Sequence, residues 1–138
     1  MSEIPLFKHY FSMFRNYAVF SGRTDRGEFW WAVGMHTIIM FIIRFLSQFL
    51  SLLAGAAHVP MTLLSAVILL LISVYSLATV IPLTALTVRR LHDADRSGWW
   101  LLLSVSGIGS ILLLIWLCRE GTEDTNLFGS DPHPIRQY

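Results

Sequence analysis

The sequence predicts an all-α membrane protein with about three transmembrane helical segments and an N-terminal amphipathic helix in the membrane interface. Hydrophobic residues make up 54% of the 138 residues and charged residues only 14%, and the mean hydropathy is +0.59. The net charge of +1 creates no global field that would attract nucleic acid, so no nucleic-acid partner is expected. We expect residues 1–138 to form a single multi-pass membrane domain.

Aromatic residues recur at three- and four-residue steps over residues 5–18, which predicts the interfacial helix. They are Phe7, Tyr10, Phe11, Phe14 and Tyr17. Two interpretations of this helix stay open. It lies in the membrane interface, or it packs its aromatic face on the protein's own spans.

Two long apolar segments follow, at residues 29–53 and 59–88. At about 1.5 Å per residue, the first is long enough to cross a hydrocarbon core of about 30 Å. The second is too long for one upright span and too short for two. We therefore expect it to tilt, or to bend at Pro82, because proline lacks an amide donor and crowds the preceding turn.

The third apolar segment, at residues 99–118, allows two structures because it contains Gly107 and Gly109. It either crosses the membrane as one span or folds back as a re-entrant hairpin. Its length favours the span, and this is the structure that we expect. Residues 119–138 form a polar tail, which a full span places outside the cell and a hairpin returns to the cytoplasm.

Basic residues in the short loops set the orientation of the chain. Seven flank the membrane segments on one side, whereas the turn at 54–60 has none. This distribution predicts a cytoplasmic N-terminus, and it favours the hairpin for the third segment. The seven residues are Lys8, Arg15, Arg23, Arg26, Arg89, Arg90 and Arg96.

Two stretches, "DRGEFWW" at 25–31 and "DRSGWW" at 95–100, share a pattern where the chain enters the membrane. Each places Asp-Arg and a small residue before paired tryptophans. Indole rings settle at membrane interfaces, where the ring is buried and the N–H is hydrated, so shared membrane chemistry explains the pattern better than a duplicated unit. The predicted interface anchors are Trp30, Trp31, Trp99 and Trp100.

The stretch "RRLHDADRSGWW" at 89–100 contains the clearest candidate for chemistry, His92 beside Asp93. A histidine oriented by a carboxylate suits general acid–base catalysis. However, the sequence offers no nucleophile elbow and no second cluster of His or Cys at metal-ligand spacing. We therefore expect a structural loop that pairs its own charges, with no catalytic residue, no metal site and no cofactor. An alternative function, the third that we consider, is an enzyme that acts on lipid headgroups through His92 and Asp93.

Arg44 lies within the first apolar segment, where a guanidinium costs several kcal/mol unless it reaches the interface or a partner. Thr37, Arg44 and Ser51 repeat every seven residues, and Ser47 and Gln48 lie alongside. Either Arg44 extends to the far interface, or this polar stripe faces water or protein, in the chain's other segments or in a homo-oligomer. The second functional alternative is therefore a subunit of a small oligomeric channel or transporter that uses Arg44 and Gln48.

Three stretches together resemble the signatures of a family of small bacterial inner-membrane proteins catalogued as domain of unknown function 805. They are "NYAVFSGRTDRGEFWW" at 16–31, "RRLHDADRSGWW" at 89–100 and "GTEDTNLFGSDP" at 121–132. The resemblance implies a multi-pass inner-membrane protein without an established activity. The matching residues are Phe20, Gly22, Arg23, Arg26, Glu28, Trp30, Arg90, Leu91, His92, Asp93, Arg96, Ser97, Trp99, Trp100, Gly121, Asn126, Phe128, Gly129, Asp131 and Pro132.

The sequence departs from the family pattern at Gly27, at Gly107 and at Glu123-Asp124. These departures concern the shape of the third segment and the tail. If the three signatures meet on one face, the tail is cytoplasmic and the third segment is a hairpin.

The predicted function is that of an integral inner-membrane protein of unknown biochemical role. We expect a non-enzymatic component whose charged cytoplasmic face contacts membrane lipids, including anionic ones, or a partner protein. The residues of this face are Arg23, Arg26, Glu28, Arg90, His92, Asp93 and Arg96.

Overall fold

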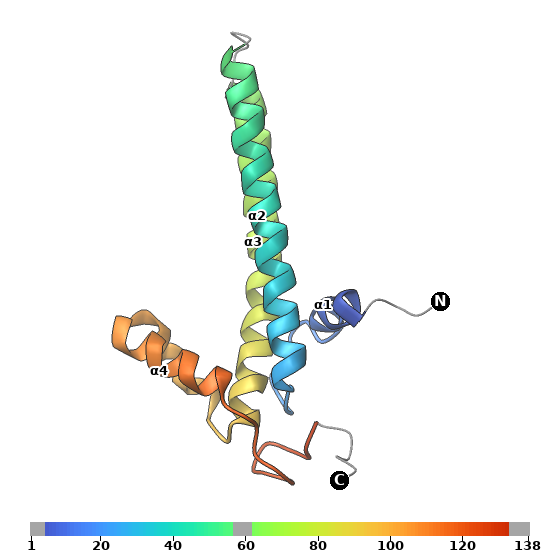
Figure 1. Ribbon diagram of the computed structural model, residues 1–138, viewed down its shortest axis with the longest axis vertical. Coiled ribbons are helices and arrows are strands. Elements are labelled where there is room, and N and C mark those ends of the chain that lie inside the picture. The colour runs from blue at the N-terminus through green and yellow to red at the C-terminus, as the bar shows by residue number, and fades with distance from the viewer. Residues whose placement is uncertain (1–4, 57–61, 133–138) are drawn as a thin grey trace.

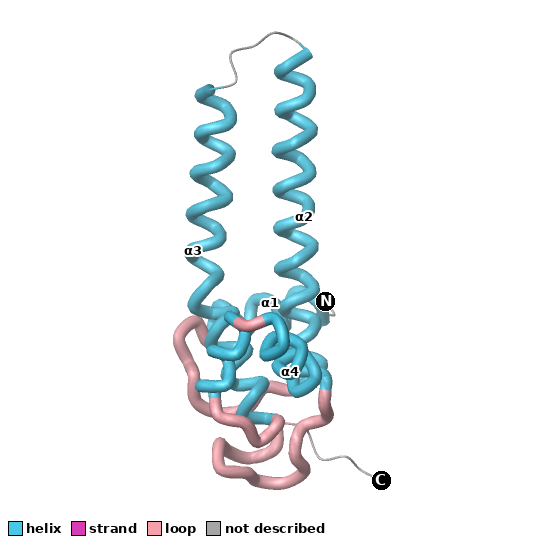
Figure 2. Tube along the Cα trace, turned by 90° about the vertical axis from the view of Figure 1, so that its left-hand side faces the viewer, coloured by secondary structure: helices cyan, strands magenta, loops and turns pink. Residues whose placement is uncertain are grey.

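The computed structural model describes residues 5–56 and 62–132. Its elements are α1 (Pro5–Arg15), α2 (Arg26–Ala56), α3 (Thr62–Asp93), the 3-10 helix η1 (Gly98–Val105) and α4 (Gly107–Cys118). α2 and α3 form a long antiparallel pair, and the other elements gather around one end of it (Figures 1 and 2). We call this end the base; it contains the start of α2 and the end of α3. Within the described residues the prediction of an all-helical fold is confirmed.

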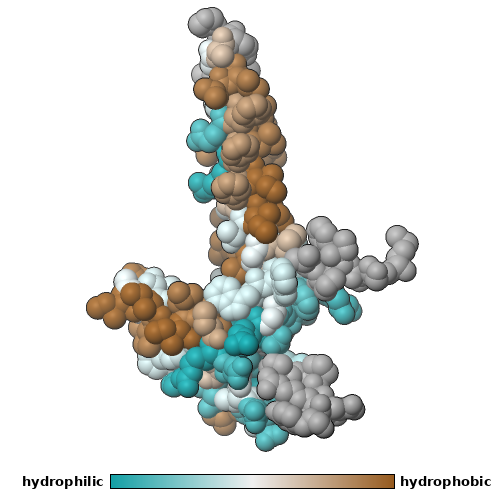
Figure 3. Space-filling view, in the orientation of Figure 1, coloured by the Kyte–Doolittle hydropathy of each residue, from teal (hydrophilic) through white to brown (hydrophobic). Residues whose placement is uncertain are grey.

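α2 and α3 are each long and apolar enough to cross a membrane. At about 1.5 Å per residue, the 31 residues of α2 extend about 46 Å, which exceeds a hydrocarbon core of about 30 Å. Large apolar side chains along both helices are exposed, and Figure 3 shows the hydrophobic surface that they form away from the base. Such a surface is stable against lipid and unfavourable in water.

α3 continues as a helix through Asp93, so the expected loop at the start of "RRLHDADRSGWW" is instead the last turn of a helix. Tertiary packing explains this difference, because Leu86 and Leu91 are fully buried in the base. The helix then ends in a turn where Asp95 has a φ of 54° and the Arg96 amide donates to Leu91 O. The helix also continues on both sides of Pro82, whose side chain is buried.

The third apolar segment is not one helix, so the expected full span is wrong. η1 has 8 residues and α4 has 12, and α4 extends only about 18 Å. Both ends of this hairpin are held at the base, because Arg90 Nε donates to Leu117 O at 3.1 Å and Arg96 N donates to Leu91 O. The hairpin therefore projects sideways from the helix pair (Figure 1).

The turn of the hairpin depends on Ser106 and Gly109. The Ser106 hydroxyl oxygen accepts a hydrogen bond from the Gly109 amide at 3.1 Å, which caps the start of α4. A Cβ atom on Gly109 would lie 2.8 Å from Leu103 Cβ and would overlap Leu103 O. Only glycine allows α4 to approach η1 this closely.

Replacing Gly109 with Ala should therefore destabilise the hairpin by about 1–2 kcal/mol, because the added methyl group overlaps backbone. Thermal unfolding in detergent, followed by tryptophan fluorescence, measures this loss. Gly107→Ala is the matched control, since a Cβ at Gly107 meets nothing within 4 Å. Equal melting temperatures for the two variants would contradict this packing.

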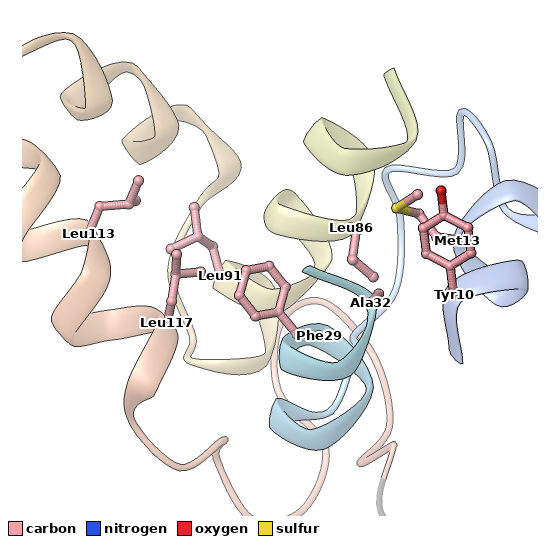
Figure 4. Packing of buried hydrophobic residues seen from close by; sticks show 8 residues of the cluster. All are labelled: Tyr10, Met13, Phe29, Ala32, Leu86, Leu91, Leu113 and Leu117. Carbon is pink, nitrogen blue, oxygen red and sulfur yellow. The ribbon is translucent and has the colours of Figure 1, made fainter. Parts of the chain in front are cut away.

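The buried core lies in the base, where α1, α2, α3 and α4 meet. Tyr10 and Met13 of α1 lie toward Leu86 and Ala32 (Figure 4). At the other end of the same cluster, Phe29 and Leu91 lie toward Leu113 and Leu117 of α4. Tyr10 and Met13 thus pack on the protein itself, whereas Phe11 of the same helix is 63% exposed. The location of α1 in the membrane interface stays a prediction.

Candidate functional site

Asp93, at the end of α3, is the centre of a buried charge cluster in the base. Its Oδ1 accepts from Arg23 Nε at 2.9 Å, and its Oδ2 accepts from Arg90 Nη1. The three side chains are at most 1% exposed. A carboxylate removed from water in this way is stable only because two guanidinium groups and their hydrogen bonds compensate it.

The two arginines also bind the backbone of the C-terminal part of the chain. Arg23 Nη1 donates to Asp124 O at 2.6 Å, and Arg90 Nη2 donates to Arg119 O. The Asp93 carbonyl accepts from the Thr122 amide at 2.9 Å. The cluster therefore joins the loop before α2, the end of α3 and the tail, so the three signature stretches meet on one face of the base.

His92 lies beside this cluster but forms no hydrogen bond with Asp93. Its Nδ1 donates to Gly22 O at 3.2 Å, and its ring stacks on Phe128 with 4.1 Å between the ring centroids. Its backbone carbonyl accepts from Asn126 Nδ2 at 2.8 Å. His92 thus fixes the tail against the loop before α2.

The remaining residues of the predicted face lie around the cluster rather than in it. Arg26 is half-exposed and faces Glu120 at 3.7 Å. Glu28 Oε1 accepts from the Ser12 hydroxyl at 2.6 Å, which ties α1 to α2. The Arg96 guanidinium lies 5.0 Å from the centre of the Trp116 ring, in cation–π geometry.

This geometry does not support acid–base chemistry by His92 and Asp93. The Asp93 carboxylate is used by two arginines, and His92 Nδ1 points to a backbone carbonyl. Among residues 5–56 and 62–132, no group of three or more His, Cys, Asp or Glu side chains is placed to hold a metal ion. The arrangement instead holds the tail and the hairpin in place.

Arg44 and Gln48, the two candidate polar residues of the first span, point outward. Arg44 and Gln48 are both exposed on α2, and the hydroxyl groups of Thr37 and Ser47 donate to carbonyls of their own helix, at Val33 and Arg44. The four predicted anchor tryptophans are exposed and lie at the start of α2 and in η1. They are Trp30, Trp31, Trp99 and Trp100.

The sequence reasoning missed two features. The sequence predicts Arg89 as an orienting charge in a self-paired turn, whereas in the structure Arg89 is 7% exposed. Tyr75 links α1 to α2, because its hydroxyl lies 2.7 Å from the Tyr10 hydroxyl and 3.1 Å from His36 Nδ1. Helical spacing places Tyr75, Leu86 and Arg89 near one face of α3, but their partners on α1 and α2 become known only from the tertiary structure.

Fold and site together define a small helical membrane protein with two apolar spans, a sideways hairpin and a base closed by buried ion pairs. The chain belongs to the family described as "Protein of unknown function (DUF805)", whose profile matches residues 17–130. The chain is 40% identical over 124 residues to the "Inner membrane protein YhaI" of Escherichia coli, covering 89% of this chain and 93% of the relative. It is 32% identical over 124 residues to the "Inner membrane protein YhaH" of Escherichia coli, covering 89% and 94%.

No solved structure matches the chain. Both relatives are inner-membrane proteins, and the family carries no assigned activity. The chain is accordingly an integral inner-membrane protein of unknown biochemical role.

Proposed function

We propose that the protein is a non-enzymatic membrane component whose base faces the cytoplasm and contacts anionic lipid headgroups. One observation carries this proposal: the apolar hairpin is exposed at its tip and basic at both ends. Val105 and Ile108 at the tip are 89% and 87% exposed, and the exposed Arg96 and Arg119 flank the two ends. A hairpin of this kind inserts its tip into one leaflet and places its guanidinium groups among the headgroups.

The distribution of exposed charge on the remaining surface supports the same proposal. Exposed basic side chains lie on α1, at the start of α2 and at the hairpin ends, whereas the exposed acidic ones lie mainly in the tail, farther from the spans (Figure 1). Apart from Arg44 on the span, the exposed basic residues of the described part of the chain are Lys8, Arg15, Arg26, Arg96 and Arg119. Anionic lipids attract such basic residues, and the acidic tail would be kept away from the membrane surface.

Tryptophan quenching by brominated lipids tests the lipid contact, since Trp99 and Trp100 lie in the hairpin. In reconstituted vesicles, brominated phosphatidylglycerol should quench more strongly than brominated phosphatidylcholine. Replacing Arg96 and Arg119 with Gln should lower this preference by roughly fivefold per charge, from about 1 kcal/mol per basic residue. Arg44→Gln, on the span, is the matched control and should keep the preference. Equal quenching of the wild-type protein by both lipids would contradict the proposal.

The proposed orientation rests on the number of spans and on the basic residues of the base. Two spans return the chain to its starting side, so the N-terminus and the tail should both be cytoplasmic. A C-terminal fluorescent protein should therefore fold and fluoresce, and a C-terminal alkaline phosphatase should be inactive. Insertion of the phosphatase at residue 57, between the spans, should give the opposite result. Active phosphatase at the C-terminus would overturn the orientation.

A further inference from the structure

Arg89 is the exception among the buried arginines of the base. Arg23 and Arg90 each bind Asp93 and backbone carbonyls. Arg89 is only 7% exposed, yet its Nε and Nη2 atoms are buried without a hydrogen-bond partner within the described part of the chain. A buried guanidinium with unused donors costs several kcal/mol, so the site is complete only when an acceptor joins it.

The two unused donors lie on one edge of the guanidinium. Nε and Nη2 point in the same direction, and this edge is the one that binds two oxygens of a carboxylate or a phosphate in parallel. In Arg23 the Nε and Nη2 atoms of this edge both lie 2.9 Å from one carboxylate oxygen, Asp93 Oδ1. An oxyanion suits the same edge of Arg89, because it can accept from both donors at once.

Arg89 lies where α1, α2 and α3 meet. Its carbonyl accepts from the Thr24 amide at 3.2 Å, just before α2. On α3, Leu86 packs toward Met13 of α1 (Figure 4). Arg89 comes three residues after Leu86 and therefore lies near the same face of the helix. Glu28 of α2 acts on Arg89 electrostatically, but Glu28 Oε1 is already bonded to Ser12 of α1.

We propose that Arg89 binds a phosphate-type oxyanion beneath α1, at the junction of α1, α2 and α3. The site lies at the membrane end of the base, where the phosphate of an anionic lipid headgroup is the nearest abundant oxyanion; this assignment of the source rests on the proposed lipid contact. Because the donor atoms are covered, the oxyanion enters only when the elements packed around Arg89 move apart. A shift of α1 would break the Ser12–Glu28 and Tyr10–Tyr75 hydrogen bonds.

Binding to the full-length protein in a neutral detergent tests the proposal. Calorimetric titrations would use inorganic phosphate in one arm and short-chain phosphatidylglycerol in the other, with a short-chain diacylglycerol, which carries no phosphate, as the control lipid. Saturable binding of inorganic phosphate would assign the site to phosphate itself. Binding of phosphatidylglycerol alone would assign it to a lipid headgroup, and either result supports the oxyanion site.

Variants then localise the binding. Arg89→Gln should weaken it by roughly tenfold or more, because the bidentate edge is lost. Arg89→Lys keeps the charge but loses the edge, so it should weaken binding while the protein remains folded. Arg44→Gln, which removes an exposed charge from the span, is the matched control and should bind as the wild type does.

Three results would overturn the proposal. The first is that the wild-type protein binds neither ligand. The second is that Arg89→Lys binds as tightly as the wild type. The third is that Glu28→Gln destabilises the ligand-free protein as much as Arg89→Gln does. The last result would mean that Glu28 itself satisfies Arg89. Failure here is distinguishable from failure of the proposed lipid contact, because Arg96→Gln and Arg119→Gln change the lipid preference of the hairpin and leave the Arg89 site intact.

Discussion

Replacing Asp93 with Asn should lower the free energy of unfolding by about 3–5 kcal/mol, the largest effect expected for a single substitution in this protein. Asp93 is the carboxylate between Arg23 and Arg90, and all three side chains are buried. Asn has the same shape but no charge, and its NH₂ group would point donor hydrogens at a guanidinium group that also donates. Two buried cations would then share one neutral acceptor.

Unfolding in mixed detergent and dodecyl sulfate micelles, followed by tryptophan fluorescence, measures this loss. Asp95→Asn is the matched control, two residues away. Asp95 is exposed and has a φ of 54°, a conformation that Asn also tolerates, so this change should alter stability by less than about 0.5 kcal/mol. Equal stability of the two variants would show that the buried pairs contribute nothing.

The helices of this protein could be predicted from sequence because their signal is local. Long apolar runs specify α2 and α3, and aromatic spacing specifies α1. The continuation of α3 to Asp93 could not be predicted in this way, because "RRLHD" is polar and resembles a loop. Its helical structure depends on Leu91 packing in the base and on Arg90 binding the end of α4.

The third segment shows a second limit of local reasoning. Twenty apolar residues are long enough for a span, and their hydropathy does not distinguish a span from a hairpin. The hairpin is selected by contacts between residues that are far apart in the sequence. Arg90 donates to Leu117 O, and Arg23 donates to Asp124 O in the tail. With both ends fixed to one base, the segment has to turn back at Ser106.

The candidate site was predictable as a set of residues but not as a set of pairs. Charge and motif indicated Arg23, Arg90 and Asp93, and the structure brings these three together. The same reasoning offered His92 as the partner of Asp93, whereas His92 bonds to Gly22 O. Adjacent residues on a helix point about 100° apart, so neighbours in sequence often serve different contacts.

The second large effect is expected at Gly121, where the tail crosses the buried cluster. Replacing Gly121 with Ala should cost about 3 kcal/mol, at the upper end for an overpacked site. The added Cβ would lie 2.6 Å from Asp93 Cγ and would overlap Oδ2. The carboxylate cannot move away, because Arg23 and Arg90 hold both of its oxygens.

A double-mutant cycle separates this overlap from a general effect of alanine in the tail. Asp93→Ala removes the carboxylate that the new methyl group meets, so adding Gly121→Ala to that variant should cost much less than adding it to the wild type. Gly34→Ala is the matched control, because a Cβ at this helical position meets nothing within 4 Å and alanine favours the helix. Additive costs for the two changes would show that the tail does not depend on close contact with Asp93. A large interaction energy between Gly121→Ala and Asp93→Ala would show that the close contact of Gly121 with Asp93 holds the tail against the base. α4 and the tail can remain beside α3 only while glycine lets the backbone pass the carboxylate.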